Sequence, residues 1–325
     1  MRNYVLILPY GAFDNYMYRD LMKLECVNTY FLNKPTSNKI INFMKRIHRS
    51  CSLNNCVNLP FKGVWSYSLI HLISDDTFLI FDTGALSMLS MTFLEKIKNS
   101  PKRPKMGVVV VDSMHAHSSH MKIAKPIILG FEWDIVLSFD SKDCNEYGFK
   151  YVGQTLYSKI TDICPSKNES DIYFVGRNKN NRNMMVEKIF KLLKKDGVKC
   201  NFNLGNANLK NFFFSKENGG IREFYYNLPY SEVLADILST SCILEVMQEG
   251  QNAQTARYYE AVCYNKKLLT NNESVKKLPF YNSDYIKVFH SIDEIDAGWI
   301  KDNKEVNFGY NNEFSPLKII DLINE

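Results

Sequence analysis

Short runs of apolar residues alternate with helix-like stretches along most of this chain. Tyr4 to Leu8 (YVLIL) and Val108 to Val111 (VVVV) are uninterrupted apolar runs, the pattern of strands that are buried on both faces of a parallel sheet. Such strands need helices to cover both faces of the sheet. The alternation therefore favours a doubly wound α/β fold, and 325 residues are enough for two domains of that type.

The pattern stops and restarts near the middle of the chain. Residues 162–170 (DICPSKNES) have no periodicity, and the strand-like run Asp171 to Val175 follows them. We predict a Rossmann-like domain over residues 1–163 and a second one over residues 164–325, whose last helix, after Pro316, can return to the first domain. The predicted fold class is α/β, with two Rossmann-like domains facing a cleft. Ligands of such sheets bind beyond the carboxyl ends of the strands.

Further elements follow from the same patterns. We predict helices over residues 15–25 and 38–48, and strands over residues 61–74 and Phe78 to Phe81. Residues 205–221 are polar and interrupted by phenylalanine, so we expect a loop there.

Composition and charge narrow the class of protein. The formal net charge is +5, and Lys and Arg are dispersed along the chain, which disfavours a nucleic-acid-binding protein. The N-terminal apolar run is too short for a signal peptide, and no run approaches the roughly 20 apolar residues of a membrane span. The eight cysteines lack the spacing of a zinc site and fit thiols of a reducing cytosol. We expect a cytoplasmic protein, and its small basic surplus is compatible with peripheral contact at the inner face of an anionic membrane.

The stretch from Cys242 to Asn272 has the pattern of a strand, a polar turn, a helix and a second strand. Glu249 to Asn252 form the turn, Thr255 opens the helix, and Leu268 begins the second strand. Because a turn of this kind presents backbone N–H groups at a helix N-terminus, it can hold an anion, most often a phosphate.

Motifs for several common chemistries are missing from the sequence. There is no G-x-G-x-x-G fingerprint, no P-loop and no G-x-S-x-G elbow. Nicotinamide redox chemistry, P-loop phosphoryl transfer and acyl hydrolysis are therefore disfavoured.

Groups suited to a nucleoside diphosphate occur in the second half instead. Arg177, Lys179 and Arg182 follow its first strand, where they can direct cations at phosphate oxygens, although a solvated loop explains Arg177 and Lys179 equally well. Glu260, on the predicted helix, can accept hydrogen bonds from two ribose hydroxyls. It can equally be the ion-pair partner of Arg257 or of Lys266.

These residues carry a resemblance to a known family. Gln251 to Asn272 resembles the donor-site segment of bacterial GT-B glycosyltransferases of lipopolysaccharide and capsular polysaccharide biosynthesis, with Thr-x-Arg before Glu-Ala on the helix. Tyr173 to Arg177, Val111 to Ser113 and Phe139 to Asp143 are also similar to this group. The resemblance implies a metal-independent hexosyltransferase with no cofactor, whose donor substrate is a nucleotide sugar, UDP-linked. The donor-binding residues that it implies are Arg177, Lys179, Arg182, Gln251, Gln254, Thr255, Arg257 and Glu260.

The first domain would then bind the acceptor, a glycan or a lipid-linked saccharide. If the reaction inverts configuration, a base must remove the proton of the acceptor hydroxyl, and Asp112 or His117 can serve. His115, His117 and His120 follow a predicted strand, and a metal site and an ordinary polar loop are the other interpretations of this cluster. Candidate acceptor-binding residues are Tyr10, Gly11, Phe13 and Trp65, whose aromatic members could instead belong to the core.

Two other classes of function fit the same sequence. One is a non-catalytic GT-B-like protein that binds a glycan or regulates a partner subunit. The other is a nucleotide-sugar epimerase, which would act without an acceptor. We expect no nucleic-acid partner, and a homo-oligomer is left open.

Overall fold

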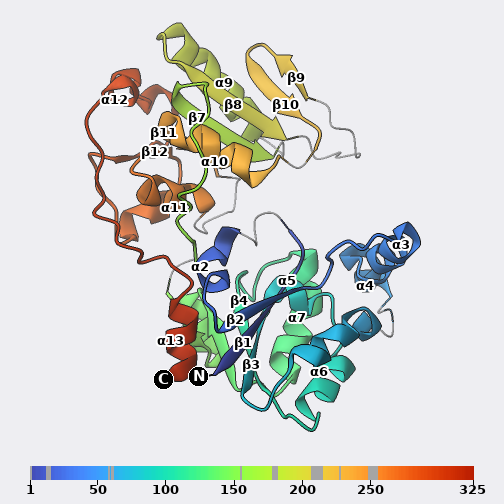
Figure 1. Ribbon diagram of the computed structural model, residues 1–325. Helices are drawn as coiled ribbons and strands as arrows, with labels where there is room; N and C mark the ends of the chain where they lie inside the picture. The colour runs from blue at the N-terminus through green and yellow to red at the C-terminus, as the bar shows by residue number, and fades with distance from the viewer. Residues whose placement is uncertain are drawn as a thin grey trace. The chain divides into compact units, whose positions relative to one another are not determined.

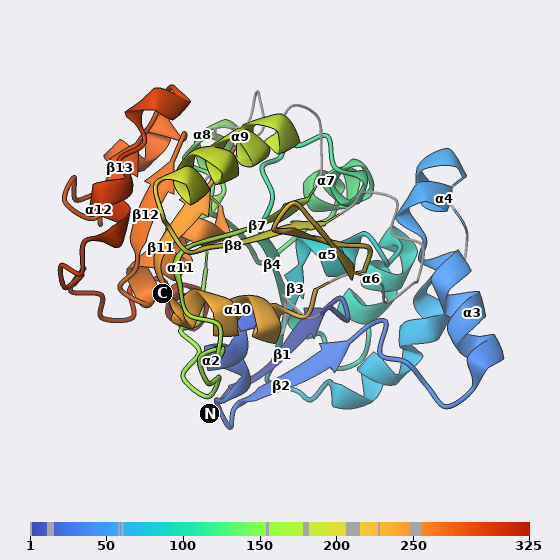
Figure 2. The same ribbon diagram turned by 90° about the horizontal axis from the view of Figure 1, so that it is seen from above.

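The computed structural model describes residues 2–11, 16–57, 59, 62–153, 156–177, 182–205, 215–226, 228–247 and 255–325. The chain divides into two compact units (Figures 1 and 2). Unit 1 comprises Met1–Ser158 and Phe314–Glu325, and unit 2 comprises Lys159–Glu313. The division after Ser158 lies a few residues before the boundary expected from the sequence.

Unit 1 is built on a parallel sheet with the strand order β2-β1-β3-β4-β5-β6. The predicted run YVLIL lies in β1, and alternate residues of this strand enter two different apolar clusters. Val5 and Ile7 belong to one cluster and Leu6 and Leu8 to the other, so the sheet is covered on both faces. The strands are β1 Asn3–Leu8, β2 Val27–Phe31, β3 Thr77–Asp82, β4 Lys105–Val110, β5 Ile135–Ser138 and β6 Lys150–Tyr151.

The helices of unit 1 differ from the sequence-based expectation in two places. The predicted strand over residues 61–74 is the 3-10 helix η1 (Lys62–Leu72). In the described part of the predicted helix over 15–25, Tyr16 and Met17 are helical and α2 (Arg19–Met22) follows, so the helical conformation ends before Glu25. The strand β2 that follows α2 was not predicted. The remaining helices are α3 Lys39–His48, α4 Cys51–Cys56, α5 Thr83–Leu86, α6 Met91–Lys98, α7 Ser119–Gly130, α8 Ser141–Tyr147 and α13 Lys318–Asn324.

Unit 2 has a sheet with the order β13-β12-β11-β7-β8-β10-β9, in which only β9 runs antiparallel to its neighbour among the described strands. The expected loop over residues 205–221 contains the hairpin β9–β10, whose turn includes Gly219 and Gly220 with φ of 61° and 99°. The strands are β7 Ser170–Arg177, β8 Cys200–Gly205, β9 Ser215–Asn218, β10 Ile221–Phe224, β11 Thr240–Glu245, β12 Lys267–Thr270 and β13 Ile286–Val288. The helices are α9 Arg182–Lys195, α10 Tyr230–Leu238, α11 Ala256–Cys263, η2 Glu273–Lys277, η3 Ile292–Glu294 and α12 Ala297–Lys301.

The last helix, α13, belongs to unit 1 although unit 2 precedes it in the chain. Ile319 is fully buried in the cluster that contains Leu6, and the Tyr4 hydroxyl donates to Asn324 Oδ1 over 2.8 Å. Ser315 Oγ donates to Asp20 Oδ2 over 2.7 Å, which fixes the approach to the helix. Across the described residues, none of the helices combines the length and the hydropathy needed to cross a bilayer.

Candidate functional site

A buried polar network lies at the carboxyl edge of the sheet in unit 2. Glu245 ends β11 and lies in register with Thr270, which ends β12. The Glu245 carboxylate is only 3% exposed and accepts hydrogen bonds from the hydroxyls of Thr255 and Thr270. Burial raises the pKa of Glu245 against the effect of these two hydrogen bonds. The network ties the ends of two parallel strands to the start of α11.

The start of α11 is capped by Thr255, as the sequence predicts. Thr255 has extended backbone angles, and its Oγ1 accepts from Arg257 N over 3.2 Å. On the other side of the turn, Met247 N donates to Asn271 Oδ1 over 2.7 Å. Hydrogen bonds therefore fix Met247 and Thr255, which flank the predicted turn. Gln251 and Gln254 lie outside the described residues.

Glu260 is completely buried one helical turn further along α11. Its Oε2 lies 2.7 Å from Arg257 Nη1, and its Oε1 accepts from the Tyr230 hydroxyl over 2.8 Å. Burial raises the pKa of Glu260 to about 7, although Arg257 and Tyr230 act to lower it. Of the two ion-pair partners considered from the sequence, Arg257 is the one found, because Lys266 donates to Leu238 O instead. The contact between Glu260 and a ribose stays a prediction.

Cationic side chains lie at the carboxyl end of β7 in the same unit. Arg177 is exposed, whereas Arg182, at the start of α9, is half-buried and donates from Nη1 to Arg177 O over 3.4 Å. Burial lowers the pKa of Arg182, and nearby Glu245 acts to raise it. A Cβ at Gly176 would lie 3.1 Å from Arg182 Nη1, so the glycine leaves room for the guanidinium group. Lys179 lies outside the described residues.

The predicted catalytic candidates lie in unit 1, after β4. Asp112 and His117 are both exposed. His115 Nε2 lies 2.9 Å from Glu146 Oε2 and 3.8 Å from the buried Asp143, whose Oδ2 accepts from Met114 N. His115 therefore interacts with two carboxylates of α8. The roles of Asp112 and His117 stay predictions.

Sequence reasoning missed a constellation around His120. The Nδ1 atom of His120 lies 3.3 Å from Cys51 Sγ and 3.1 Å from Ser87 Oγ. The hydrogen bond with Cys51 raises the pKa of His120, and the charge of Asp112 adds to this. Burial acts to raise the pKa of the Cys51 thiol, but the hydrogen bonds with His120 and Ser87 outweigh it and lower that pKa. Cys51 and His120 lie on α4 and α7, and Ser87 directly follows α5, so no local motif could have predicted the three together.

The described candidate acceptor residues, Tyr10, Gly11 and Trp65, all belong to unit 1. Tyr10 is 49% exposed and contacts Phe31 edge-to-face, with ring centroids 5.8 Å apart. Gly11 follows Tyr10 in the described chain, and Phe13 lies outside it. Trp65, on η1, is half-buried and donates from Nε1 to His48 Nδ1 over 2.8 Å, so its polar atom is engaged within the unit.

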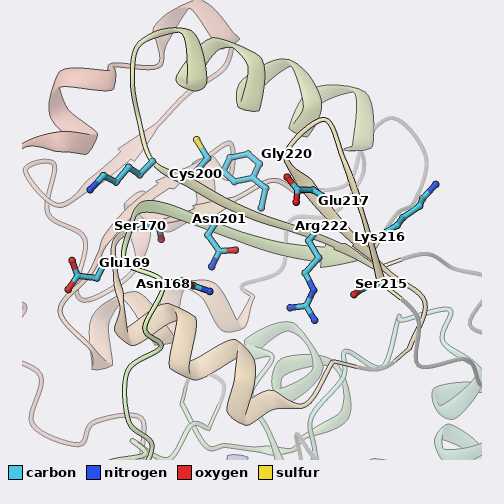
Figure 3. Close-up of a pocket in the computed structure, with 12 residues that line it drawn as sticks. Asn168, Glu169, Ser170, Cys200, Asn201, Ser215, Lys216, Glu217, Gly220 and Arg222 are labelled. Atoms are coloured by element: carbon cyan, nitrogen blue, oxygen red, sulfur yellow. The ribbon is translucent and has the colours of Figure 1, made fainter.

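One cavity of unit 2 lies away from the buried network. Within the described ranges, no group of three or more His, Cys, Asp or Glu side chains is placed to hold a metal ion. A cavity of about 520 Å³ is lined by the amino ends of β7 and β8 and by β9 and β10 (Figure 3). There Arg222 is paired with Glu232, 2.6 Å away. This cavity lies at the amino end of β7, whereas Arg177 lies at its carboxyl end. We therefore place the candidate site at the carboxyl edge of the sheet.

Solved structures identify the fold. No family model matches the chain, and no curated protein sequence matches it. The trehalose-6-phosphate synthase OtsA is similar with a TM-score of 0.57 and 9% identity, over 99% of this chain and 95% of that one. A UDP-forming α,α-trehalose-phosphate synthase from Burkholderia xenovorans gives a TM-score of 0.53 and 9% identity, over 100% and 95% of the two chains. TarM is matched over only about half of its length (54%), with a TM-score of 0.43 and 13% identity, too weak a similarity to support an argument.

The similarity extends over 99% to 100% of this chain and confirms the predicted α/β class with one sheet in each of two units. Each unit is built on an α/β sheet whose described strands are parallel apart from β9, and the fold is GT-B-like, as in the glycosyltransferases that it matches. At 9% identity the similarity shows the fold alone.

Proposed function

We propose that this protein is a glycosyltransferase that moves a hexosyl group from a nucleotide sugar to a glycan or lipid-linked acceptor. We place it in the synthesis of a bacterial cell-surface polysaccharide, in the cytoplasm at the inner face of the membrane. The observation that carries the proposal is the buried network of Glu245, Thr255 and Thr270, joined to the Arg257–Glu260 pair. It fixes a helix N-terminus at the edge of the sheet where ligands of such folds bind.

The donor is held mainly through its diphosphate in this proposal. Arg177, Lys179 and Arg182 neutralise the phosphates, so charge can develop on the leaving group without an obligatory metal ion or cofactor. Gln251, Gln254 and the start of α11 add donors. The name of one similar structure, the UDP-forming synthase from Burkholderia xenovorans, supports a UDP-linked donor.

Glu260 is the ribose-binding group in this proposal. Because the Glu260 carboxylate is fully buried against Arg257, a donor can reach it only if the Arg257 side chain moves. Such movement would expose the carboxylate and lower its pKa from about 7, because burial is the main cause of the raised value. Donor binding would then release a proton when it is measured near neutral pH.

The acceptor binds to unit 1 in this proposal. Tyr10, Gly11, Phe13 and Trp65 contribute stacking and contact surface. Asp112 or His117 removes the proton of the attacking hydroxyl if the reaction inverts configuration.

A thermal-shift screen against UDP, GDP, CDP and their sugars tests the donor site, because a ligand that binds only the folded protein raises the Tm. We expect a shift with one nucleotide, and a loss of affinity of about ten-fold or more in Arg177→Ala, since a charge-assisted hydrogen bond is removed. Lys188→Ala, an exposed change on α9, is the control and should leave the shift intact. No shift with any nucleotide would overturn the proposal.

Product analysis separates the alternatives. Transfer requires release of the nucleoside diphosphate together with an acceptor product. Interconversion of the nucleotide sugar without acceptor would identify an epimerase, and binding without turnover would favour a non-catalytic protein. Unchanged turnover in both Arg177→Ala and Glu260→Gln would refute the proposal that these residues bind the donor of an enzyme reaction.

A further inference from the structure

One segment of unit 1 is free of acidic residues. Between Glu25 and Asp75 the sequence contains no Asp or Glu, although 35 of the 325 residues of the chain are acidic. We call residues 26–74 the acid-free segment. Its Lys and Arg residues are Lys34, Lys39, Lys45, Arg46, Arg49 and Lys62. The segment therefore carries an uncompensated positive charge, whereas the whole chain is only mildly basic.

The same segment holds most of the exposed apolar side chains. Of the fourteen large hydrophobic residues that are exposed in the described chain, ten lie in it. They are Ile40, Ile41, Phe43, Met44, Ile47, Leu53, Val57, Val64, Tyr67 and Leu72, exposed by 37% to 74%. Single exposed apolar residues are normal on a protein surface, but their concentration in one segment marks an interaction site.

Helix α3 turns its apolar side outward. Ile40, Phe43, Met44 and Ile47 follow the i, i+3, i+4, i+7 spacing of one helix face, and no residue of α3 is buried. Figures 1 and 2 show α3 and α4 at the outer margin of unit 1.

The polar side of α3 makes the contacts with the rest of the unit. His48 Nδ1 accepts from Trp65 Nε1 of η1 over 2.8 Å. Arg49, just after the helix, is 3% exposed and donates to Leu32 O and Ser66 Oγ. This arrangement is the reverse of an ordinary surface helix, whose apolar side packs on the core.

A cationic cavity adjoins the helix. It has a volume of about 380 Å³, and Lys45, Arg46 and Arg49 line it together with Asn33 and Asn42. Burial lowers the pKa of Arg49 to about 10, and burial together with Arg49 lowers the pKa of Lys45. Crowded cations favour an anionic ligand. A phosphate group fits this chemistry.

We propose that the acid-free segment docks unit 1 onto an anionic phospholipid bilayer. The apolar face of α3 inserts among the lipid chains near the headgroup boundary, and a lipid phosphate occupies the cavity at Lys45, Arg46 and Arg49. An apolar stripe flanked by cations and free of carboxylates is the composition of helices that lie in a membrane interface. The same charge argues against a second copy of this chain as the occupant, because two acid-free faces would repel each other.

Vesicle sedimentation tests the proposal with the full-length protein and no donor or acceptor present. We expect binding to vesicles of phosphatidylglycerol and phosphatidylcholine in equal parts, weaker binding at high salt, and little binding to pure phosphatidylcholine. Because each cation near an anionic surface adds about five-fold to affinity, the double variant Lys45→Gln/Arg46→Gln should bind at least ten-fold more weakly. Phe43→Ser/Ile47→Ser should lose a similar factor.

Matched variants outside the segment provide the controls. Leu129→Ser and Met184→Ser remove apolar side chains that are 48% and 58% exposed, and Lys188→Gln/Lys191→Gln removes two exposed cations. These should bind vesicles as the wild type does, and all variants should keep the wild-type Tm, since the changed side chains are not buried.

Three results would overturn the proposal: no binding to anionic vesicles, equal binding to both vesicle types, or equal losses in the control variants. A dimer in sedimentation velocity that Phe43→Ser/Ile47→Ser dissolves would assign the face to a second copy instead. Membrane binding does not depend on the proposed transferase activity. A negative nucleotide screen would refute the proposed function, and a negative vesicle assay would refute membrane docking.

Discussion

The pH dependence of folding should depend on the buried Glu260 carboxyl. Its pKa is about 7 in the folded chain, against an ordinary value of 4.5, because burial removes the carboxylate from water. Between these two pH values the folded state keeps the proton and the unfolded state has lost it. Rising pH therefore favours unfolding over this range.

The size of the effect follows from the same two values. A pKa shift from 4.5 to about 7 corresponds to about 3 kcal/mol of free energy of unfolding. This stability is fully present below about pH 4.5 and is lost as the pH rises through about 7, above which the Glu260 contribution is constant. Glu260→Gln has nearly the same shape and can still accept from Tyr230, but it cannot titrate.

Urea unfolding at about pH 5 and about pH 8 measures the effect as a difference between proteins. The free energy of unfolding of the wild type should fall, relative to that of Glu260→Gln, by about 2.5 kcal/mol over this range, because a small part of the effect is already lost at about pH 5. Glu187→Gln changes an exposed carboxylate on α9 of the same unit and should behave as the wild type. A parallel pH dependence in wild type and Glu260→Gln would refute the reasoning, since the buried carboxyl would then not hold a proton in the folded state.

Three further predictions concern packing in the two units. Gly205→Ala places a Cβ 2.6 Å from the ring of Phe224 and should lower the free energy of unfolding by about 1–3 kcal/mol in urea titrations. Lys267→Met removes a buried ammonium group that donates to two backbone carbonyls at the end of α12, so it should cost about 1–3 kcal/mol and speed hydrogen exchange in α12. Deletion of residues 314–325 should speed hydrogen exchange in β1 while β7 stays protected, because α13 belongs to unit 1 and packs in the apolar cluster that contains β1 residues.

The fold class was predictable because central parallel strands have a simple signature. YVLIL and VVVV are buried on both faces, so nearly every position is apolar. Edge strands have no such signature. In β2 only Val27 is buried, and pairing with β1 rather than composition makes it a strand.

Apolar content alone misled the prediction for η1. The segment from Lys62 to Leu72 is apolar without a clear period, and it folds as a 3-10 helix with Leu69 buried and Gly63 beneath the ring of Phe93. A Cβ at Gly63 would lie 2.4 Å from that ring, so tertiary packing decides the conformation. Periodicity cannot report a contact of this kind.

The candidate site was predictable where its residues are close in the sequence. The Arg257–Glu260 pair and the Thr255 cap follow from helical spacing. Glu245 was not singled out, because its pairing with Thr270 depends on the register of two strands. The contact between Cys51 and His120 depends on the packing of α4 against α7.

The return of α13 makes unit 2 an insertion within unit 1. Unit 2 is continuous in sequence from Lys159 to Glu313, whereas unit 1 lacks part of its apolar cluster until the segment from Phe314 has been synthesised. Tyr157 N donates to Phe314 O over 2.7 Å, so the two ends of the insertion are joined inside unit 1. During translation, unit 2 can therefore fold to completion first, and unit 1, which begins earlier, finishes last.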